Sequence, residues 1–409
     1  MNAQKLVFFL VFIPSSTLLL FSEVKKKNII HYGVTKIRHT GPRSQSTITN
    51  NTKSHDYYPP TSKFKSKQRI VLFAGPHKTA SSSIEYNLMR WIRDATHPSG
   101  LGSTWSWPSP IDAIYGGRKQ KCEWEQKVFY WWIQALSGAK NVRCLPSFHG
   151  KDEYSRIEIL DKYKTEFYNE WMKGRSLAIA TEAMDFVTGK KGLLDDIIRQ
   201  LPWNADFPVK ASGSNNDITV VVTYRSPRVK HLESMWHQCC MREGVSFYQY
   251  LVDPKSRFHV ATSPAFDSLR LVEKFLEKGL NVTLVDMEGV INHGYDISNI
   301  MACDILGANC NADKTFIGME DKQAEILNVK NGHSSSSIHN ITTDKLEHIN
   351  WAILRYDCAL VSVIGHPNVT TLYSFGIEKM IEFCDTLDSG ERIMTMNALR
   401  NKIAAIVQN

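Results

Sequence analysis

Short apolar runs with little polar alternation recur along the chain from residue 69 onward. Such runs are typical of strands buried on both faces, as in parallel sheets that helices cover. The β-branched residues Val, Ile and Thr are frequent in them, which favours strands. They predict four strands: Arg69–Ala74, Leu177–Thr181, Ile218–Tyr224 and Val282–Asp286.

Between these runs, apolar residues recur at intervals of three and four, the period of an amphipathic helix. Strands that alternate with helices predict an α/β fold, in which helices flank a parallel sheet. The region after Asp286 is mostly helical in pattern, notably Thr343–Val363, and predicts a helical C-terminal extension. The helices predicted between the strands are Ser82–Asp94, Tyr154–Lys173, Gly192–Gln200, Val229–Met241 and Ser268–Glu277.

The first part of the chain lacks these patterns. Leu6–Phe21 is uncharged, and Pro14 interrupts a stretch that is short for a transmembrane helix. Residues 24–68 are polar and rich in Lys, Ser, Thr, Asn and Pro, as flexible stems are. We interpret residues 1–23 as a signal anchor, with a cleaved signal peptide as the alternative. Either reading places residues 69–409, the predicted folded domain, in the secretory lumen.

The formal net charge of +8 is unevenly distributed. Residues 1–69 hold twelve of the 49 Lys and Arg residues and only two of the 41 acidic ones, Glu23 and Asp56. The remaining 340 residues therefore carry 37 basic and 39 acidic groups. The total charge gives no basis for a nucleic-acid partner, and any anion site in the folded part must be a local arrangement.

Cysteines and sequons agree with a lumenal domain. The chain has eight cysteines, of which Cys303–Cys310 is the first disulfide we expect and Cys358–Cys384 the second. Asn-x-Thr acceptor sites for N-glycosylation stand at Asn50, Asn281, Asn340 and Asn368.

The strand Arg69–Ala74 is followed by a turn of small residues and then a helix. This order brings backbone N–H groups and the positive end of a helix dipole to the carboxyl edge of the sheet. Lys78 adds a cation, and the sequence is not a Walker A motif because His77 stands where that motif has Gly. A solvated lysine beside serines that cap a helix is the ordinary alternative. The anion cradle comprises Gly75, Lys78, Thr79, Ala80, Ser81, Ser82 and Ser83.

The segment GPHKTASSS resembles the 5′-phosphosulfate loop of sulfotransferases that use 3′-phosphoadenylyl sulfate (PAPS). Its His-Lys-Thr-Ala-Ser-Ser form is similar to that of the Golgi galactose-3-O-sulfotransferase family, which includes cerebroside sulfotransferase. The resemblance implies that Lys78 contacts the oxygen between phosphate and sulfate. It also implies that the loop amides and hydroxyls hold the 5′-phosphate, with PAPS as co-substrate and no metal.

A second anion site is expected where the strand Ile218–Tyr224 ends in Arg225, because a planar guanidinium binds phosphate oxygens in pairs. In the same family, Arg-x-Pro followed by a helical Ser holds the 3′-phosphate, which implies this role for Arg225 and Ser234. In the family the Ser usually follows the Arg by eight residues, whereas Ser234 follows Arg225 by nine. The turn between them must absorb the extra residue if Ser234 is to point toward the 3′-phosphate. An Arg225 that pairs with a carboxylate is the alternative.

Transfer needs a base that removes the proton of the acceptor hydroxyl. Glu182 follows the strand Leu177–Thr181 and so lies at the active edge of the predicted sheet. His77 is the second candidate and His149 a distant third. The aromatic run Phe129–Trp132 either lines a sugar platform or, as is more common, belongs to the core.

Together these patterns predict a PAPS-dependent sulfotransferase that modifies a hydroxyl of a glycan, glycolipid or glycoprotein, with galactose as one candidate. The resemblance implies a single-pass type II Golgi membrane protein with a lumenal catalytic domain. A lumenal P-loop kinase that uses ATP and Mg²⁺ and an inactive glycan-binding relative are the alternatives. The sequence names neither the acceptor hydroxyl nor the oligomeric state.

Overall fold

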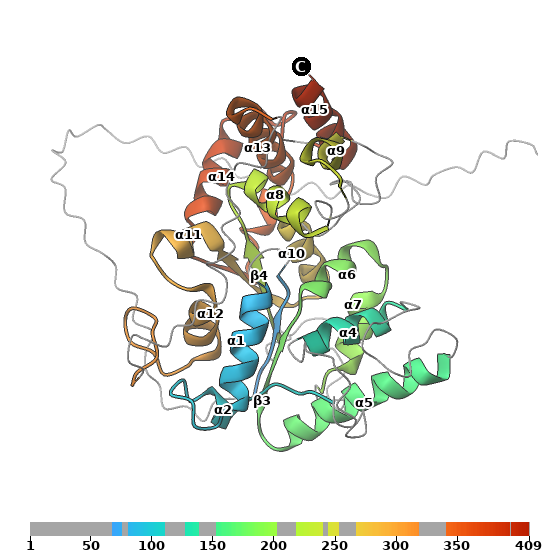
Figure 1. Ribbon diagram of the computed structural model, residues 1–409, viewed down its shortest axis with the longest axis vertical. Coiled ribbons are helices and arrows are strands. Elements are labelled where there is room, and N and C mark those ends of the chain that lie inside the picture. The colour runs from blue at the N-terminus through green and yellow to red at the C-terminus, as the bar shows by residue number, and fades with distance from the viewer. Residues whose placement is uncertain are drawn as a thin grey trace, which may run out of the picture. The chain divides into compact units, whose positions relative to one another are not determined.

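Six strands form one parallel sheet in the order β2-β3-β1-β4-β5-β6, and helices flank it (Figure 1). This computed structural model describes residues 68–75, 81–110, 127–138, 153–202, 218–239, 244–252, 267–318, 341–392 and 394–408. The strands are β1 (Ile70–Phe73), β2 (Trp105–Ser106), β3 (Ser176–Ala180), β4 (Ile218–Tyr224), β5 (Asn281–Asp286) and β6 (Val369–Leu372).

All four predicted strands are confirmed, with ends that differ by at most one residue. The sequence reading missed the two edge strands, β2 and β6. β2 has only two residues, and β6 (VTTL) is half-exposed and polar, so neither shows a buried apolar run. The expected C-terminal extension is therefore mostly helical, but it also contributes the last strand of the sheet.

The predicted helices are also present with small shifts at their ends. The helix expected at Thr343–Val363 ends at Cys358, and Val361–Val363 forms a separate 3₁₀ turn, where β-branched residues and Gly365 disfavour an α-helix. The longer helices are α1 (Ser81–Arg93), α4 (Val128–Leu136), α5 (Glu153–Met172), α7 (Leu193–Gln200), α8 (Arg228–Cys239), α10 (Ser268–Leu276), α13 (Thr343–Cys358), α14 (Phe375–Asp385) and α15 (Met396–Gln408). The shorter ones are α2 (Leu101–Thr104), α6 (Phe186–Gly189), α9 (Phe247–Val252), α11 (Met287–Asn292) and α12 (Ile297–Ile300).

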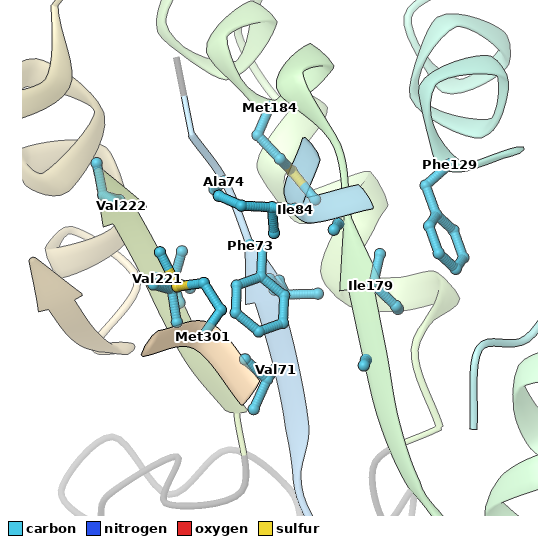
Figure 2. Close-up of a cluster of buried hydrophobic side chains, with 14 of the residues drawn as sticks. Val71, Phe73, Ala74, Ile84, Phe129, Ile179, Met184, Val221, Val222 and Met301 are labelled. Atoms are coloured by element: carbon cyan, nitrogen blue, oxygen red, sulfur yellow. The ribbon is translucent and has the colours of Figure 1, made fainter. Parts of the chain in front are cut away.

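Two apolar clusters hold these elements together. The larger surrounds the sheet, and Figure 2 shows its part near the end of β1, where Ala74, Ile84 and Met184 are buried. The smaller joins α8 and α9 to α13 and α15, with Leu232 and Ile353 fully buried. The turn after β4 therefore leads directly from the sheet into the C-terminal helical layer.

Both expected disulfides, Cys303–Cys310 and Cys358–Cys384, are present. Residues 1–23 and nearly all of 24–68, which carry the anchor and stem predictions, lie outside the described residues. Within the described part of the chain, none of the helices has the length and apolar character that crossing a membrane requires.

Candidate functional site

Three neighbouring strands bring the predicted site residues to one edge of the sheet. β1 lies between β3 and β4, with Phe73 opposite both Ala180 and Val221. Because the strands are parallel, their carboxyl ends meet at the same edge, where β3 leads to Glu182, β1 to Gly75 and β4 to Arg225. The positions that follow these three strands therefore lie side by side.

The register also sets the separation of the two anion sites. The backbone N–H of Ala74 donates to the carbonyl of Val221 at 2.8 Å, so the pairing of β1 with β4 continues to the end of the strand. Continued by one residue, it sets Gly75 beside Thr223, two residues before Arg225. With a strand spacing of about 4.8 Å and a rise of about 3.3 Å per residue, Gly75 and Arg225 are about 8 Å apart.

The cradle is described only at its two ends. Gly75 is buried at the end of β1, and Ser81, Ser82 and Ser83 form the first turn of α1. The other cradle residues lie outside the described residues; these are Lys78, Thr79 and Ala80. The second base candidate, His77, lies outside them too. The strand-to-helix geometry that an anion cradle requires is present, with the N-terminus of α1 at the carboxyl edge of the sheet.

Glu182 is buried beside this cradle. Thr181 caps the 3₁₀ helix that Glu182 begins, because its hydroxyl accepts a hydrogen bond from the N–H of Ala183 at 3.1 Å. Lys127 donates to Glu182 Oε1 at 2.9 Å, and its Nζ lies 2.8 Å from Glu85 Oε2. The backbone N–H of Glu182 donates to Glu85 Oε1 at 3.1 Å, which closes a buried cluster of two carboxylates around one ammonium.

Lys127 is the one cation of this cluster, and both glutamates contact it. Burial raises the pKa of Glu85 to about 8, although the attraction of Lys127 opposes the shift. Burial alone would lower the pKa of Lys127, but the two glutamates outweigh it and raise that pKa. At neutral pH Glu85 is therefore mostly protonated, and Lys127 carries the positive charge of the cluster.

The cluster is adjacent to the start of the cradle. A small cavity at the carboxyl edge is lined by Gly75 after β1, Glu85 of α1, Thr181 after β3 and Thr223 of β4. Glu85 lies one helical turn after the serines of α1, on the face that also carries Leu88. The sequence reading missed Glu85 and Lys127. A glutamate on the apolar stripe of a helix was a visible signal for Glu85, whereas the position of Lys127 carried none.

Arg225 follows β4 and is half-buried, and Ser234 is half-buried on α8. Burial lowers the pKa of Arg225, against the attraction of Glu233, but an arginine stays charged at neutral pH. α8 begins at Arg228, directly after a cis peptide bond between Ser226 and Pro227. The segment in which we expect the extra residue of spacing to be absorbed, around Ser226–Val229, thus holds this peptide bond and the start of α8.

Arg228, the first residue of α8, has a structural role. Arg228 is buried, and its Nε lies 2.8 Å from Asp357 Oδ2 on α13. Tyr224 donates its hydroxyl to the same Oδ2 atom at 3.0 Å, and the Arg228 guanidinium lies 5.0 Å from the centre of the Tyr224 ring. These contacts tie the turn that carries Arg225 to the C-terminal helical layer and hold its backbone in place.

The sequence also offered the aromatic run Phe129–Trp132 as a sugar platform and His149 as a base. The aromatic run belongs to the core rather than to a sugar platform, because Phe129, Trp131 and Trp132 are buried in α4. His149 lies outside the described residues. No group of His, Cys, Asp or Glu with metal-binding geometry occurs within the residues that the structure describes.

The carboxyl edge therefore brings together the two described ends of the predicted cradle, Arg225 on one side of it and the buried Glu182 on the other. Such an arrangement can hold an anion with two separated phosphates and present a reacting group to a base. Comparisons with protein-family models, with curated proteins and with solved structures found no match.

Proposed function

We propose that this chain is a sulfotransferase that moves a sulfuryl group from PAPS to a hydroxyl of a carbohydrate. The observation that carries the proposal is the order β3-β1-β4, because it aligns the positions after three strands as carboxylate, anion cradle and arginine. The resemblance of GPHKTASSS to a 5′-phosphosulfate loop supports the same reading. The α/β fold alone would be compatible with many activities.

The donor would bind with its 5′-phosphosulfate on the cradle and its 3′-phosphate on Arg225. The amides at the start of α1 and the hydroxyls of Thr79 and Ser81–Ser83 would hold the 5′-phosphate. Arg225 would form paired hydrogen bonds to the 3′-phosphate, with Ser234 of α8 as a further donor. The contact between Arg228 and Asp357 would keep the Arg225 turn in position without touching the donor.

The reaction would be an in-line displacement at sulfur. The acceptor oxygen forms a bond to sulfur while the bond between sulfur and the bridging phosphate oxygen breaks. The bonding electron pair stays on the 5′-phosphate, where Lys78 would balance the developing charge. The proton of the acceptor hydroxyl goes to Glu182, which Lys127 orients. His77 remains the second candidate for this base.

The acceptor would be a glycan, glycolipid or glycoprotein, and the site of action the Golgi lumen with the chain anchored through residues 1–23. These points rest on the sequence patterns and the resemblance. The most informative substrate screen would offer the full-length chain ³⁵S-labelled PAPS with galactosides, uronates and tyrosine peptides. Incorporation of ³⁵S into a galactoside would identify galactose-containing glycans as the acceptor class.

Replacing Lys78 tests the proposal directly. Lys78→Ala should abolish label transfer, because the leaving phosphate loses its charge partner. Lys191→Ala, at an exposed position, is the matched control and should retain full activity. Adding EDTA distinguishes the kinase alternative, because a kinase that needs Mg²⁺ would lose its activity. Normal turnover by Lys78→Ala would refute the loop assignment.

A further inference from the structure

α8 leaves a single stripe of side chains uncovered. Among residues 228–237, the side chains that are not buried are those of Lys230, Glu233, Ser234 and His237. They follow one another at intervals of three, one and three residues, so they lie on one face of the helix. Figure 1 shows α8 beyond the carboxyl end of β4. Ser234 therefore shares its face with a lysine one turn earlier and with the glutamate beside it.

The charge of Glu233 indicates where this face points. Burial lowers the pKa of Arg225, and the attraction of Glu233 opposes that shift. An opposite charge acts on a pKa mainly at short range, so the Glu233 carboxylate lies near the Arg225 guanidinium. The stripe that carries Ser234 is thus turned toward the end of β4, where the 3′-phosphate of the donor is expected.

Glu233 also contacts a second cation. Lys230 Nζ lies 3.1 Å from Glu233 Oε2, and only 12% of the Glu233 side chain is exposed, against 51% of Lys230. The carboxylate therefore has two positive groups as neighbours, the ammonium of Lys230 and the guanidinium of Arg225. Carboxylates and phosphates bind such groups through the same kind of charged hydrogen bond. Glu233 is thus an anion that the protein itself places at the predicted phosphate site.

A lysine and a glutamate three residues apart are common on helix surfaces and contribute little there. α10 has such a pair between Lys274 and Glu277, at 2.7 Å, in which 51% of the Glu277 side chain is exposed. The pair on α8 differs, because little of Glu233 is exposed and because it also attracts Arg225. The stability of the helix alone does not account for the position of Glu233.

We propose that Glu233 competes with the 3′-phosphate of the donor for Arg225 and Lys230, and that Lys230 is a further ligand of this phosphate. Without a nucleotide, the carboxylate would balance part of the charge of the two cations. A bound 3′-phosphate would take its place on them and would be repelled by the displaced carboxylate. This competition lowers the affinity for the nucleotide and so favours release of the product. The inference rests on the proposed function, because it requires a 3′-phosphate at Arg225.

The test is calorimetric titration of the full-length chain with the product 3′-phosphoadenosine 5′-phosphate (PAP) and with 5′-AMP, which lacks the 3′-phosphate. Glu233→Gln should bind PAP about tenfold more tightly than the wild type, because it keeps the shape of the side chain without the competing charge. Lys230→Ala should bind PAP about fivefold to tenfold more weakly, since one charged hydrogen bond is lost. The affinity for 5′-AMP should be the same in all three proteins.

Glu277→Gln and Lys274→Ala on α10 are the matched controls, because they remove the same two charges from a pair with the same spacing. Both should bind PAP as the wild type does. The proposal would be overturned by an unchanged or lower affinity of Glu233→Gln for PAP, by an unchanged affinity of Lys230→Ala, or by equal changes for 5′-AMP or in the controls. If the wild type still prefers PAP to 5′-AMP in such a case, only the inference about α8 fails. A wild type without that preference would contradict the donor site as well.

Discussion

Lys127 Nζ lies 2.9 Å from Glu182 Oε1, so the residue before α4 holds the carboxylate that follows β3. The same Nζ reaches Glu85 of α1 at 2.8 Å. Three elements that are distant in the sequence thus meet at one buried ammonium next to the cradle. If Glu182 is the base, its position depends on a cation that does not itself belong to the cradle.

Removing this cation should destabilise the fold. Lys127→Met removes the cation of these two buried ion pairs, and breaking a buried ion pair on one side costs about 3–5 kcal/mol. Lys162→Met on α5 is the control, because its ion pair with Glu158 at 3.0 Å lies at the surface, partly exposed, and should contribute less than about 1 kcal/mol. Urea unfolding of both variants measures the difference. Equal unfolding free energies would show that the buried cluster does not stabilise the fold.

The protonation of Glu85 should make stability depend on pH. Its pKa of about 8 in the folded protein exceeds the ordinary value of 4.5, so the folded state binds the extra proton in this interval. The stabilisation is fully present below pH 4.5 and is lost as the pH rises toward 8. The groups that face Glu85 are Lys127 and Glu182.

Glu85→Gln mimics the protonated carboxyl group and should remove the pH-dependent stabilisation that Glu85 contributes. The unfolding free energy of the wild type should fall relative to that of Glu85→Gln as the pH rises from 5 to 8. Urea unfolding at several pH values gives both curves. Parallel curves would mean that Glu85 is already ionised in the folded protein at neutral pH.

The predictable part of the fold was its interior. Strands such as Ile218–Tyr224 are continuous apolar runs because both of their faces are buried, and this signal is local. β6 was missed because an edge strand needs no apolar run, and it forms only where β5 offers a partner. The strand ends also predicted Glu182 and Arg225 as edge residues, because the carboxyl ends of parallel strands share one edge.

The partners of those residues could not be predicted in the same way. Lys127 and Glu182 are 55 residues apart, and Arg228 pairs with Asp357 across the boundary between sheet and helical layer. Such contacts depend on how elements pack, which no local period encodes.

Exchanging Glu182 for its amide tests the choice of base. Glu182→Gln keeps the shape and the contact with Lys127 but cannot accept a proton, so transfer should fall about 10²- to 10⁴-fold. Binding of the product 3′-phosphoadenosine 5′-phosphate (PAP) should be unchanged. Transfer of ³⁵S from PAPS and calorimetry with PAP separate the two effects. Full activity in Glu182→Gln together with loss in His77→Ala would assign the base to His77 instead.

The central claim is that one nucleotide contacts both the cradle and Arg225, and ideal strand geometry puts the backbones of Gly75 and Arg225 about 8 Å apart. Calorimetric titration of wild type and Arg225→Ala with PAP and with 5′-AMP tests it most directly. The wild type should bind PAP more tightly than 5′-AMP by about 10- to 100-fold, because of charged hydrogen bonds to the 3′-phosphate. In Arg225→Ala this advantage should disappear, with the affinity for 5′-AMP unchanged. Equal affinities for the two nucleotides in the wild type, or an advantage that survives in Arg225→Ala, would contradict the account.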